Sequence, residues 1–319
     1  MRVQAVRVHF AHRLSPLRHP QRGRHSAGRR QHGLWRRARC RRPLVAHPDV
    51  PLVSFTGSTA TGERIAKATA PHVKKLSLEL GGKNANIVFA DADIDAAVAG
   101  AVKASFANQG QICLCGSRLF VANSIYDIFM AKFLAAVAAL KTGDPADPAS
   151  NLGALVSAQH KEKVLSYIAL AVEEGGSLAA GGPDPPADIP SHLADGYYVS
   201  PTVVTGLDMS ARCNNEEIFG PVVGVIRFDD SSADAGAAAV IADANAVAYG
   251  LSASVWTSDL TRAHTVAQAL DVGTVWINCW LVRDLRVPFG GQKHSGVGRE
   301  GGEYSLEFYT EQKTVCIKL

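Results

Sequence analysis

The chain has 319 residues, of which 47% are hydrophobic and 19% charged, and its formal net charge is +4 at pH 7. This length allows two domains or one large one, and no apolar run approaches the ~18 residues that a membrane span needs. No secretory signal is visible. The six cysteines are scattered, which excludes a small disulfide-built scaffold and predicts a reduced, cytoplasmic protein.

The net charge hides a sharp change of composition near Pro43. Residues 1–44 contain 13 arginines and five histidines but no Lys, Asp or Glu. Subtracting these 13 from the 33 basic residues leaves 20 against 29 acidic ones, so residues 45–319 carry a net charge of −9. The body of the chain is therefore an ordinary acidic protein.

Three interpretations of this leader compete: a basic arm that binds nucleic-acid phosphates, an organelle transit peptide, and GC-rich DNA read out of frame. We favour the out-of-frame interpretation, because Arg without any Lys is typical of it, and we rank nucleic-acid binding last. In each case we expect disorder, since so much like charge with few large apolar groups cannot offset the entropy of ordering.

Regular elements are expected from about residue 45. Asp91 and Asp93 are both candidates for capping a helix whose apolar residues recur every four positions from Ile94 to Phe106. The pattern predicts strands at 50–57, 74–80, 84–90 and 118–122, and helices at 58–70, 94–107, 124–140 and 157–176. Strands that alternate with helices of this length predict an α/β fold with largely parallel sheets.

The stretch "FTGSTATG" (55–62) places a glycine between a strand and the start of a helix, a geometry that can hold a phosphate. It is not a nucleotide-hydrolase loop, because Glu63 and Arg64 stand where Lys and Ser or Thr are needed. It is not GxGxxG either, since residue 59 is Thr. On this stretch alone, a plain strand–turn–helix junction is the better interpretation.

Two further stretches carry reactive groups. In "LELGGKNAN" (78–86), Glu79 lies between leucines at a strand end, where an apolar setting would raise its pKa and make it a general base. The alternative is an edge-strand glutamate that faces solvent. In "NQGQICLCGSR" (108–118), the CxC spacing of Cys113 and Cys115 without a second ligand cluster argues against a structural metal.

For the same two cysteines we weigh nucleophile against inert core residue. Backbone N–H groups near Cys113 would lower its pKa and favour the thiolate. A small buried neighbour is the better interpretation of Cys115. Later in the chain, "NNEEIFGPV" (214–222) presents Glu217 and Phe219 before a Gly-Pro turn, and 278–302 is a long polar, Gly-rich stretch of the kind that carries function.

Six motifs, taken in order, resemble the NAD(P)-dependent aldehyde dehydrogenase superfamily: "FTGSTATG", "LELGGK", "FANQGQIC", "EEIFGPV", "PFGGQKHSGVGRE" and "YTEQKTVCIKL". The resemblance covers residues ~45–319. It implies that Cys113 is the nucleophile that forms a thioester, with its own N–H as one oxyanion donor, and that Glu79 activates the hydrolytic water. It implies NAD, or alternatively NADP, as cofactor. The cofactor-binding positions are Gly57, Ser58, Glu217 and Phe219.

The same resemblance implies an organisation: an aldehyde dehydrogenase-like catalytic domain, a partial Rossmann-like cofactor domain and a C-terminal oligomerisation strand. After the leader, 45–81 would be the remnant of the NAD-binding domain, 82–294 the catalytic domain, 295–308 a return to the cofactor domain, and 309–319 the strand that pairs with another subunit. A homo-oligomer is therefore expected.

A narrower resemblance links "NCWLVRDLRVPFGG" and "GQICLCGSR" to the 2-aminomuconic and 2-hydroxymuconic semialdehyde dehydrogenases. Their substrates carry a carboxylate, which an Arg side chain can bind bidentately. Arg283 is the leading candidate and Arg286 the second. The alternative for Arg283 is a surface salt bridge to Asp284 or Glu300.

The family pattern extends further toward the N-terminus than this sequence does. No counterpart is found for its "PWNFP"-type stretch, which completes the oxyanion hole, or for the cofactor-binding Lys that follows. We therefore expect an N-terminally truncated chain with weak or no activity. The alternative is a non-catalytic fragment that docks on full-length aldehyde dehydrogenase subunits through its C-terminal strand.

Overall fold

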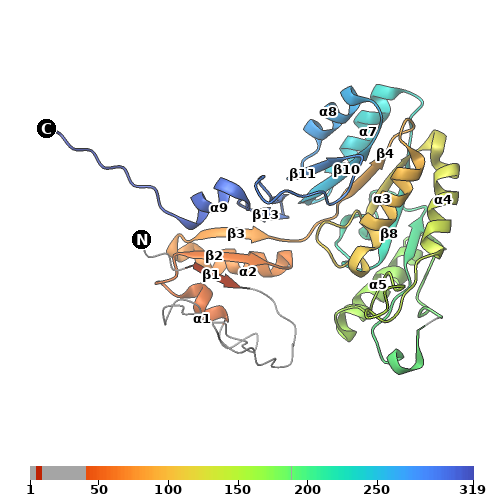
Figure 1. Cartoon of the computed structure of the whole chain (residues 1–319), viewed down its shortest axis with the longest axis horizontal. Coiled ribbons are helices and arrows are strands. Elements are labelled where there is room, and N and C mark those ends of the chain that lie inside the picture. Colours follow the sequence, from red (N-terminus) through yellow and green to blue (C-terminus); the bar gives the residue numbers. More distant parts are fainter. Residues whose placement is uncertain (1–4, 9–40, 188) are drawn as a thin grey trace.

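Two β-sheets organise the chain, which a computed structural model describes over residues 5–8, 41–187 and 189–319. Figure 1 shows them as two lobes joined at the end of β3. The larger sheet has the order β11-β10-β4-β5-β8-β7-β6, and all its pairs are parallel except β6–β7. Its strands are β4 (Ala85–Val88), β5 (Arg118–Ala122), β6 (Ser177–Ala180), β7 (Thr202–Thr205), β8 (Val222–Phe228), β10 (Ser252–Trp256) and β11 (Thr274–Ile277).

Helices cover both faces of this sheet. Because side chains alternate along a strand, Leu119 and Val121 face α3 (Ile94–Phe106) and α4 (Tyr126–Ala138), while Phe120 faces α7 (Ala233–Asn245) and α8 (Leu260–Ala269). A third apolar cluster lies beneath α5 (Ala158–Glu173) and α6 (Arg212–Asn215). The predicted α/β class with largely parallel strands is confirmed.

The smaller sheet has the order β1-β2-β3-β13. Strands β1 (Ala5–Val8), β2 (Leu52–Thr56) and β3 (Lys75–Glu79) are parallel, and β13 (Gly296–Val297) returns antiparallel to β3. The helices of this lobe are α1 (Arg41–Ala46), α2 (Thr59–Thr69) and α9 (Gly302–Tyr309). A two-stranded antiparallel ribbon pairs β9 (Tyr249–Gly250), which precedes β10, with β12 (Gln292–Lys293), which precedes β13. Single 3₁₀ turns complete the list: η1 (Ala70–His72), η2 (Ala107–Gly110), η3 (Asn123–Ile125) and η4 (Ser191–Leu193).

Two expectations for the leader need correction. Residues 5–8 form an edge strand on β2, so the expected disorder is wrong there; their sequence AVRV has the β-branched character that pairs with an open sheet edge. The boundary at residue 44 is also crossed by α1, which begins at Arg41. The rest of the predicted leader lies outside the described residues.

The capping prediction holds for one of its two candidates. Asp93 caps α3, and its carboxylate accepts from the N–H groups of Asp95 and Ala96, both at 3.1 Å. Asp91 does not cap α3; its carboxylate instead accepts from Ser258 N and from the Arg262 guanidinium. The long-range partners outcompete the local helix end because they offer Asp91 a charged donor.

The predicted C-terminal strand is absent from the single chain. Residues 311–319 are neither helix nor strand, and Figure 1 shows this segment running away from both lobes. A strand needs a neighbouring strand to satisfy its N–H and C=O groups, and no such edge of the described chain reaches this tail. Its pairing with another subunit stays a prediction. No described helix is long and apolar enough to cross a membrane.

Candidate active site

The joint between the two sheets carries the first candidate residues. β3 ends at Glu79, and residues 80–84 lead directly into β4. Ser295, which is fully buried, fastens this crossing: its carbonyl accepts from Leu80 N at 2.9 Å, and its hydroxyl donates to Gly81 O at 2.6 Å and accepts from Gly250 N at 2.9 Å. These bonds hold the chain directly after Glu79.

Glu79 itself is only 5% exposed, so the solvent-facing alternative is wrong. Neither carboxyl oxygen has a hydrogen-bond partner within the described residues. Burial, and then the charge of Glu300, raise the pKa of Glu79 to about 8, against the opposing effect of Arg299 and Arg283. A carboxyl group with this pKa exchanges protons near neutral pH, which is what a general base requires.

Cys113 is brought into place by a turn after α3. Asn108, Gln109 and Gly110 take consecutive left-handed conformations, with φ of 51°, 57° and 69°. At Gly110 a side chain is impossible, because a Cβ would lie 2.1 Å from the carbonyl oxygen of Gly220. Asn84 then fixes the loop from the other side, since its Nδ2 donates to the carbonyls of Cys113 at 2.7 Å and of Cys115 at 2.9 Å.

The structure contradicts the expectation of a lowered pKa at Cys113. Burial raises the pKa of this thiol to about 11, and the charges of Glu217 and Glu79 raise it further than the Cys113 N–H and Arg283 lower it. Cys115 is buried, and burial raises its pKa to about 12, as suits the inert neighbour that the sequence predicts. The Cys113 N–H lowers the pKa of this thiol less than the charges of Glu217 and Glu79 raise it, and these two carboxylates are brought close only by the tertiary fold.

Glu217 lies against the glycine pair that follows Glu79. The Gly82 N–H donates to its Oε1 at 3.0 Å, and a Cβ on Gly81 would lie only 2.3 Å from its Oε2. Lys163 Nζ donates to the Glu217 carbonyl at 2.8 Å. Burial raises the pKa of Glu217, opposed first by the Gly82 N–H and then by Lys163 and Lys83. Gly82 also adjoins the cysteine loop, since a Cβ on Gly82 would lie 2.8 Å from the Cys113 carbonyl oxygen. Glu79, Glu217 and Cys113, three of the predicted site residues, therefore lie together.

The strand–glycine–helix junction is the fourth component. Gly57 N donates to the Glu79 carbonyl at 3.0 Å, so the junction adjoins the same strand end. Ser58 is the N-cap of α2, yet its hydroxyl pairs with Thr61 Oγ1 at 3.0 Å and makes no capping bond. The N–H groups of the first turn are thus free of a Ser58 cap, an arrangement that suits an anionic group such as a pyrophosphate.

The two arginine candidates differ in their partners. Arg286 is paired with Asp284, through Nε at 2.9 Å and through Nη2. Arg283 is exposed, and its guanidinium lies 4.1 Å from the centroid of the Phe289 ring. In the described part of the chain no ion pair involves Arg283, so the predicted salt bridge to Asp284 belongs to Arg286 instead. The charge of Arg283 nevertheless acts on both Glu79 and Cys113.

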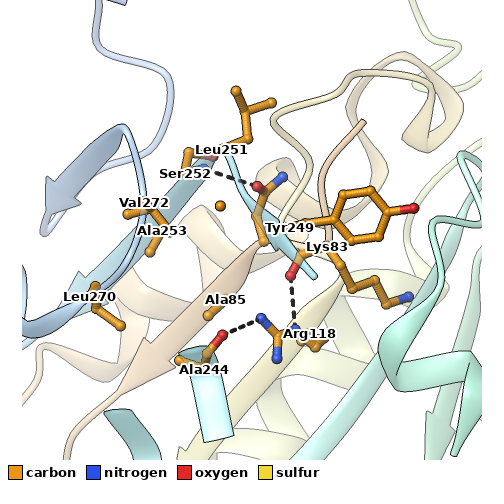
Figure 2. A pocket seen from close by; sticks show the side chains of 12 residues that line it. Lys83, Ala85, Arg118, Ala244, Tyr249, Leu251, Ser252, Ala253, Leu270 and Val272 are labelled. Carbon is orange, nitrogen blue, oxygen red and sulfur yellow. Dashed lines mark hydrogen bonds between the residues drawn. The ribbon is translucent and has the colours of Figure 1, made fainter. Parts of the chain in front are cut away.

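Several residues of this region were not predicted from the sequence as site residues. Lys83 is 2% exposed, its amine has no hydrogen-bond partner among the described residues, and burial followed by the charge of Arg118 lowers its pKa to about 7. Figure 2 shows Lys83 beside Tyr249 at a small cavity, where Arg118 donates to the carbonyls of Lys83 and Ala244, both at 2.8 Å. This cavity of about 10 Å³ has room for about one water, so it is not a substrate pocket.

The position of Lys83 directly after "LELGG" was its only sequence signal. His160 and Lys163, three residues apart on α5, carried a weak one, namely polar groups on a face next to the apolar stripe of the helix. Among the described residues, no group of three or more His, Cys, Asp or Glu side chains could hold a metal ion.

The sequence profile of the "Aldehyde dehydrogenase family" matches residues 36–315. This chain belongs to the aldehyde dehydrogenase family.

Its relatives include muconic semialdehyde dehydrogenases. It is 52% identical over 275 residues to a 2-aminomuconic semialdehyde dehydrogenase of Danio rerio and 50% identical to that of Homo sapiens, in each case over 86% of this chain and 55% of the relative. It is 49% identical over 276 residues to a 2-hydroxymuconic semialdehyde dehydrogenase of Pseudomonas sp. strain CF600, with the same coverage. The chain spans about half the length of the curated relatives it matches.

Solved structures agree with this assignment. PnpE in complex with nicotinamide adenine dinucleotide has a TM-score of 0.80 at 46% identity, covering 85% of this chain and 54% of that one. Betaine aldehyde dehydrogenase from Staphylococcus aureus in complex with NAD⁺ has a TM-score of 0.79 at 40% identity, covering 84% of this chain and 52% of that one. At these identities the aldehyde dehydrogenase fold is shown for the described chain.

Proposed function

We propose that this chain carries the catalytic residues of an NAD-dependent aldehyde dehydrogenase. The observation that carries the proposal is that Glu79, Cys113 and Glu217, far apart in the sequence, meet around the glycine pair after Glu79. The Gly82 N–H binds Glu217 Oε1 at 3.0 Å, and a Cβ on Gly82 would lie 2.8 Å from the Cys113 carbonyl oxygen. A nucleophile beside a titratable carboxyl group is the arrangement that covalent acyl chemistry requires. Two solved relatives are described as complexes with NAD, which supports the choice of cofactor.

In this mechanism the sulfur of Cys113 attacks the aldehyde carbon and forms a thiohemiacetal. Its thiol proton must leave first, and Glu79 can accept a proton near neutral pH. NAD, when bound, supplies the hydride acceptor that turns the thiohemiacetal into a thioester. After passing the thiol proton to solvent, Glu79 takes a proton from water, whose oxygen attacks the thioester carbon and expels the sulfur as the acid is released. Glu79 then returns that proton to the sulfur, which regenerates the Cys113 thiol. NADP remains the alternative cofactor.

The cofactor-binding roles follow from the contacts. The open first turn of α2 at Gly57 and Ser58 would hold the pyrophosphate. Glu217, fixed by the Gly82 N–H, would accept from the nicotinamide ribose hydroxyls, with Phe219 beside it. The start of α2, which Ser58 leaves uncapped, would offer N–H donors to the anion, and Glu217 would offer carboxylate acceptors to the sugar. The Gly57 N–H is not one of these donors, because it is bound to the Glu79 carbonyl, so Gly57 would contribute the close turn of the chain.

For the substrate we propose a semialdehyde that carries a carboxylate, such as 2-aminomuconate or 2-hydroxymuconate semialdehyde. Arg283 would bind that carboxylate: its guanidinium is stacked on Phe289 rather than paired with an acid, and its charge reaches Cys113. The names of the relatives at about 50% identity support this substrate class.

We further propose that residues 309–319 pair with another subunit in a homo-oligomer. Val315 and Ile317 are 70% and 78% exposed and are two positions apart, so in a strand they would share one face that this chain leaves uncovered. The alternative is that this tail docks a non-catalytic fragment onto full-length aldehyde dehydrogenase subunits. Light scattering of the chain with and without residues 311–319 tests the first idea. Co-purification with a full-length subunit, without turnover, would favour the second.

The test of the proposed function combines two measurements on the purified chain. Absorbance at the NADH band is followed after adding NAD and a semialdehyde, and mass spectrometry locates the labelling of cysteines by a thiol reagent. The proposal predicts NADH formation and a change in Cys113 labelling when NAD is added, while the exposed Cys316 serves as internal control. Absence of NADH, with Cys113 labelling unaffected by NAD, would refute the enzymatic role.

A further inference from the structure

Helix α5 presents a stripe of three polar side chains to the segment that carries Glu217 and Phe219. His160, Lys163 and Tyr167 are spaced by three and four residues, so they share one face of the helix. The neighbouring face is apolar and packs into the core through Val164 and Ile168. The polar stripe is therefore aimed at a specific neighbour rather than at solvent.

Each member of the stripe binds a different point of residues 216–219. His160 Nε2 lies 2.6 Å from the Phe219 carbonyl oxygen. Lys163 Nζ donates to the Glu217 carbonyl at 2.8 Å, and the Tyr167 hydroxyl donates to Glu216 Oε2 at 2.5 Å. Three donors from one helix thus reach a segment only four residues long.

This segment needs external support. Phe219 has a φ of 62°, in the left-handed region that non-glycine residues rarely adopt, and such a conformation persists only where its surroundings over-determine it. The His160 ring also packs edge-on against the Phe219 ring, with centroids 5.9 Å apart and planes at 79°. The next residue, Gly220, fits so closely that a Cβ would lie 2.5 Å from Val164 Cγ2.

We propose that His160 and Lys163 are positioning residues, which hold the backbone of 217–219 so that Glu217 and Phe219 face the nicotinamide ribose. The inference rests on the proposed function for the identity of the ligand. His160 Nε2 must carry a hydrogen to donate to a carbonyl, which either the protonated ring or one neutral tautomer provides. Generic helix packing would not require a specific donor at this atom.

The experiment compares His160→Ala with His160→Gln, because the amide nitrogen of Gln can replace the Nε2 donor. Gln159→Ala, at an exposed neighbouring position, is the matched control. Two quantities are measured in the full chain: hydrogen–deuterium exchange of the amides of 216–220, and the dissociation constant of NADH from its fluorescence. For His160→Ala we expect both exchange and dissociation constant to rise by up to about tenfold, the range for one hydrogen bond. For His160→Gln we expect both to return to within about threefold of the wild type.

The outcomes separate the two proposals. Unchanged exchange in His160→Ala, or equal defects in the Ala and Gln variants, would overturn the positioning role. Faster exchange with an unaltered NADH affinity would overturn its link to the cofactor. If the wild-type chain binds no NADH, the proposed function fails, and the exchange of 216–220 alone decides whether the stripe holds this segment.

Discussion

The backbone N–H of Gly82 donates to Glu217 Oε1 at 3.0 Å, although 135 positions separate the two residues. This bond joins the "LELGG" and "EEIF" motifs into one surface beside Cys113. It is available only because the glycine pair has no side chains, since the carboxylate of Glu217 occupies the space that a methyl group on Gly81 would fill.

Gly81→Ala should therefore displace Glu217. The added Cβ would meet Oε2 at 2.3 Å and the carboxyl carbon at 2.7 Å, and overpacking of this kind typically costs about 1–3 kcal/mol. We expect a roughly tenfold or greater loss of NADH affinity, measured by fluorescence titration. Gly153→Ala, where the nearest atoms are 3.9 Å away, is the control and should bind normally. Equal affinities in the two variants would contradict the role of Glu217.

The thiol of Cys113 should react slowly at neutral pH in the free protein. With its pKa raised to about 11 by burial and by two carboxylates, alkylation by iodoacetamide should accelerate about tenfold per pH unit from pH 7 to 10. Glu217→Gln removes the larger of the two charge effects, so it should speed labelling severalfold at pH 8. The exposed Cys316 provides the reference rate within the same chain. A rate at Cys113 that is already maximal at pH 7 would show a stabilised thiolate instead.

Glu79 should make stability depend on pH in a defined direction. Its pKa is raised in the folded state from the ordinary 4.5 to about 8, so between these values the folded protein binds more protons than the unfolded one. Its contribution to the free energy of unfolding is thus complete below pH 4.5 and is lost as the pH rises through 8, by up to about 1.4 kcal/mol per unit. In Glu79→Gln this position does not titrate, so the variant should not show this loss of stability with rising pH.

Urea unfolding at pH 5, 7 and 9 measures the difference between Glu79→Gln and the wild type. The variant should gain stability relative to the wild type at each step upward in pH. Glu303→Gln, at an exposed position, is the control, and its free energy of unfolding should change with pH as that of the wild type does. Parallel curves for both variants would mean that Glu79 titrates normally.

Arg283→Ala should weaken the binding of a substrate carboxylate without changing how Cys113 reacts with the aldehyde group. A charged, bidentate hydrogen bond contributes about 1.5–3 kcal/mol, so about 10- to 100-fold more semialdehyde should be needed to protect Cys113 from alkylation. This readout does not require turnover. A neutral aldehyde of similar size should protect both proteins equally. Arg286→Ala, which breaks only the pair with Asp284, is the matched control and should resemble the wild type.

Local chemistry explains what could be predicted from the sequence. The sequence predicts Asp93 as a helix cap and Glu79 as the end of an apolar strand from a few neighbouring residues each. The structure confirms both positions, at the start of α3 and at the end of β3. The raised pKa of Cys113 could not be read this way, because the charge of Glu217 reaches it only through the tertiary fold. The partner of Asp284 could not be predicted either. Arg283 and Arg286 are both close to it in the sequence, but only Arg286 binds it in the structure.

The crossing between the sheets has a mechanical consequence. Residues 80–84 join β3 to β4, and Ser295 holds the start of this crossing through its bonds to Leu80 and Gly81. Glu79 is the last residue of β3 in the smaller sheet, whereas Cys113 follows α3, which packs on the larger sheet. The separation of the proposed base and nucleophile therefore depends on how this crossing holds the two sheets. Ser295 supports that placement from a third point of the chain, through its bonds to Leu80, Gly81 and Gly250.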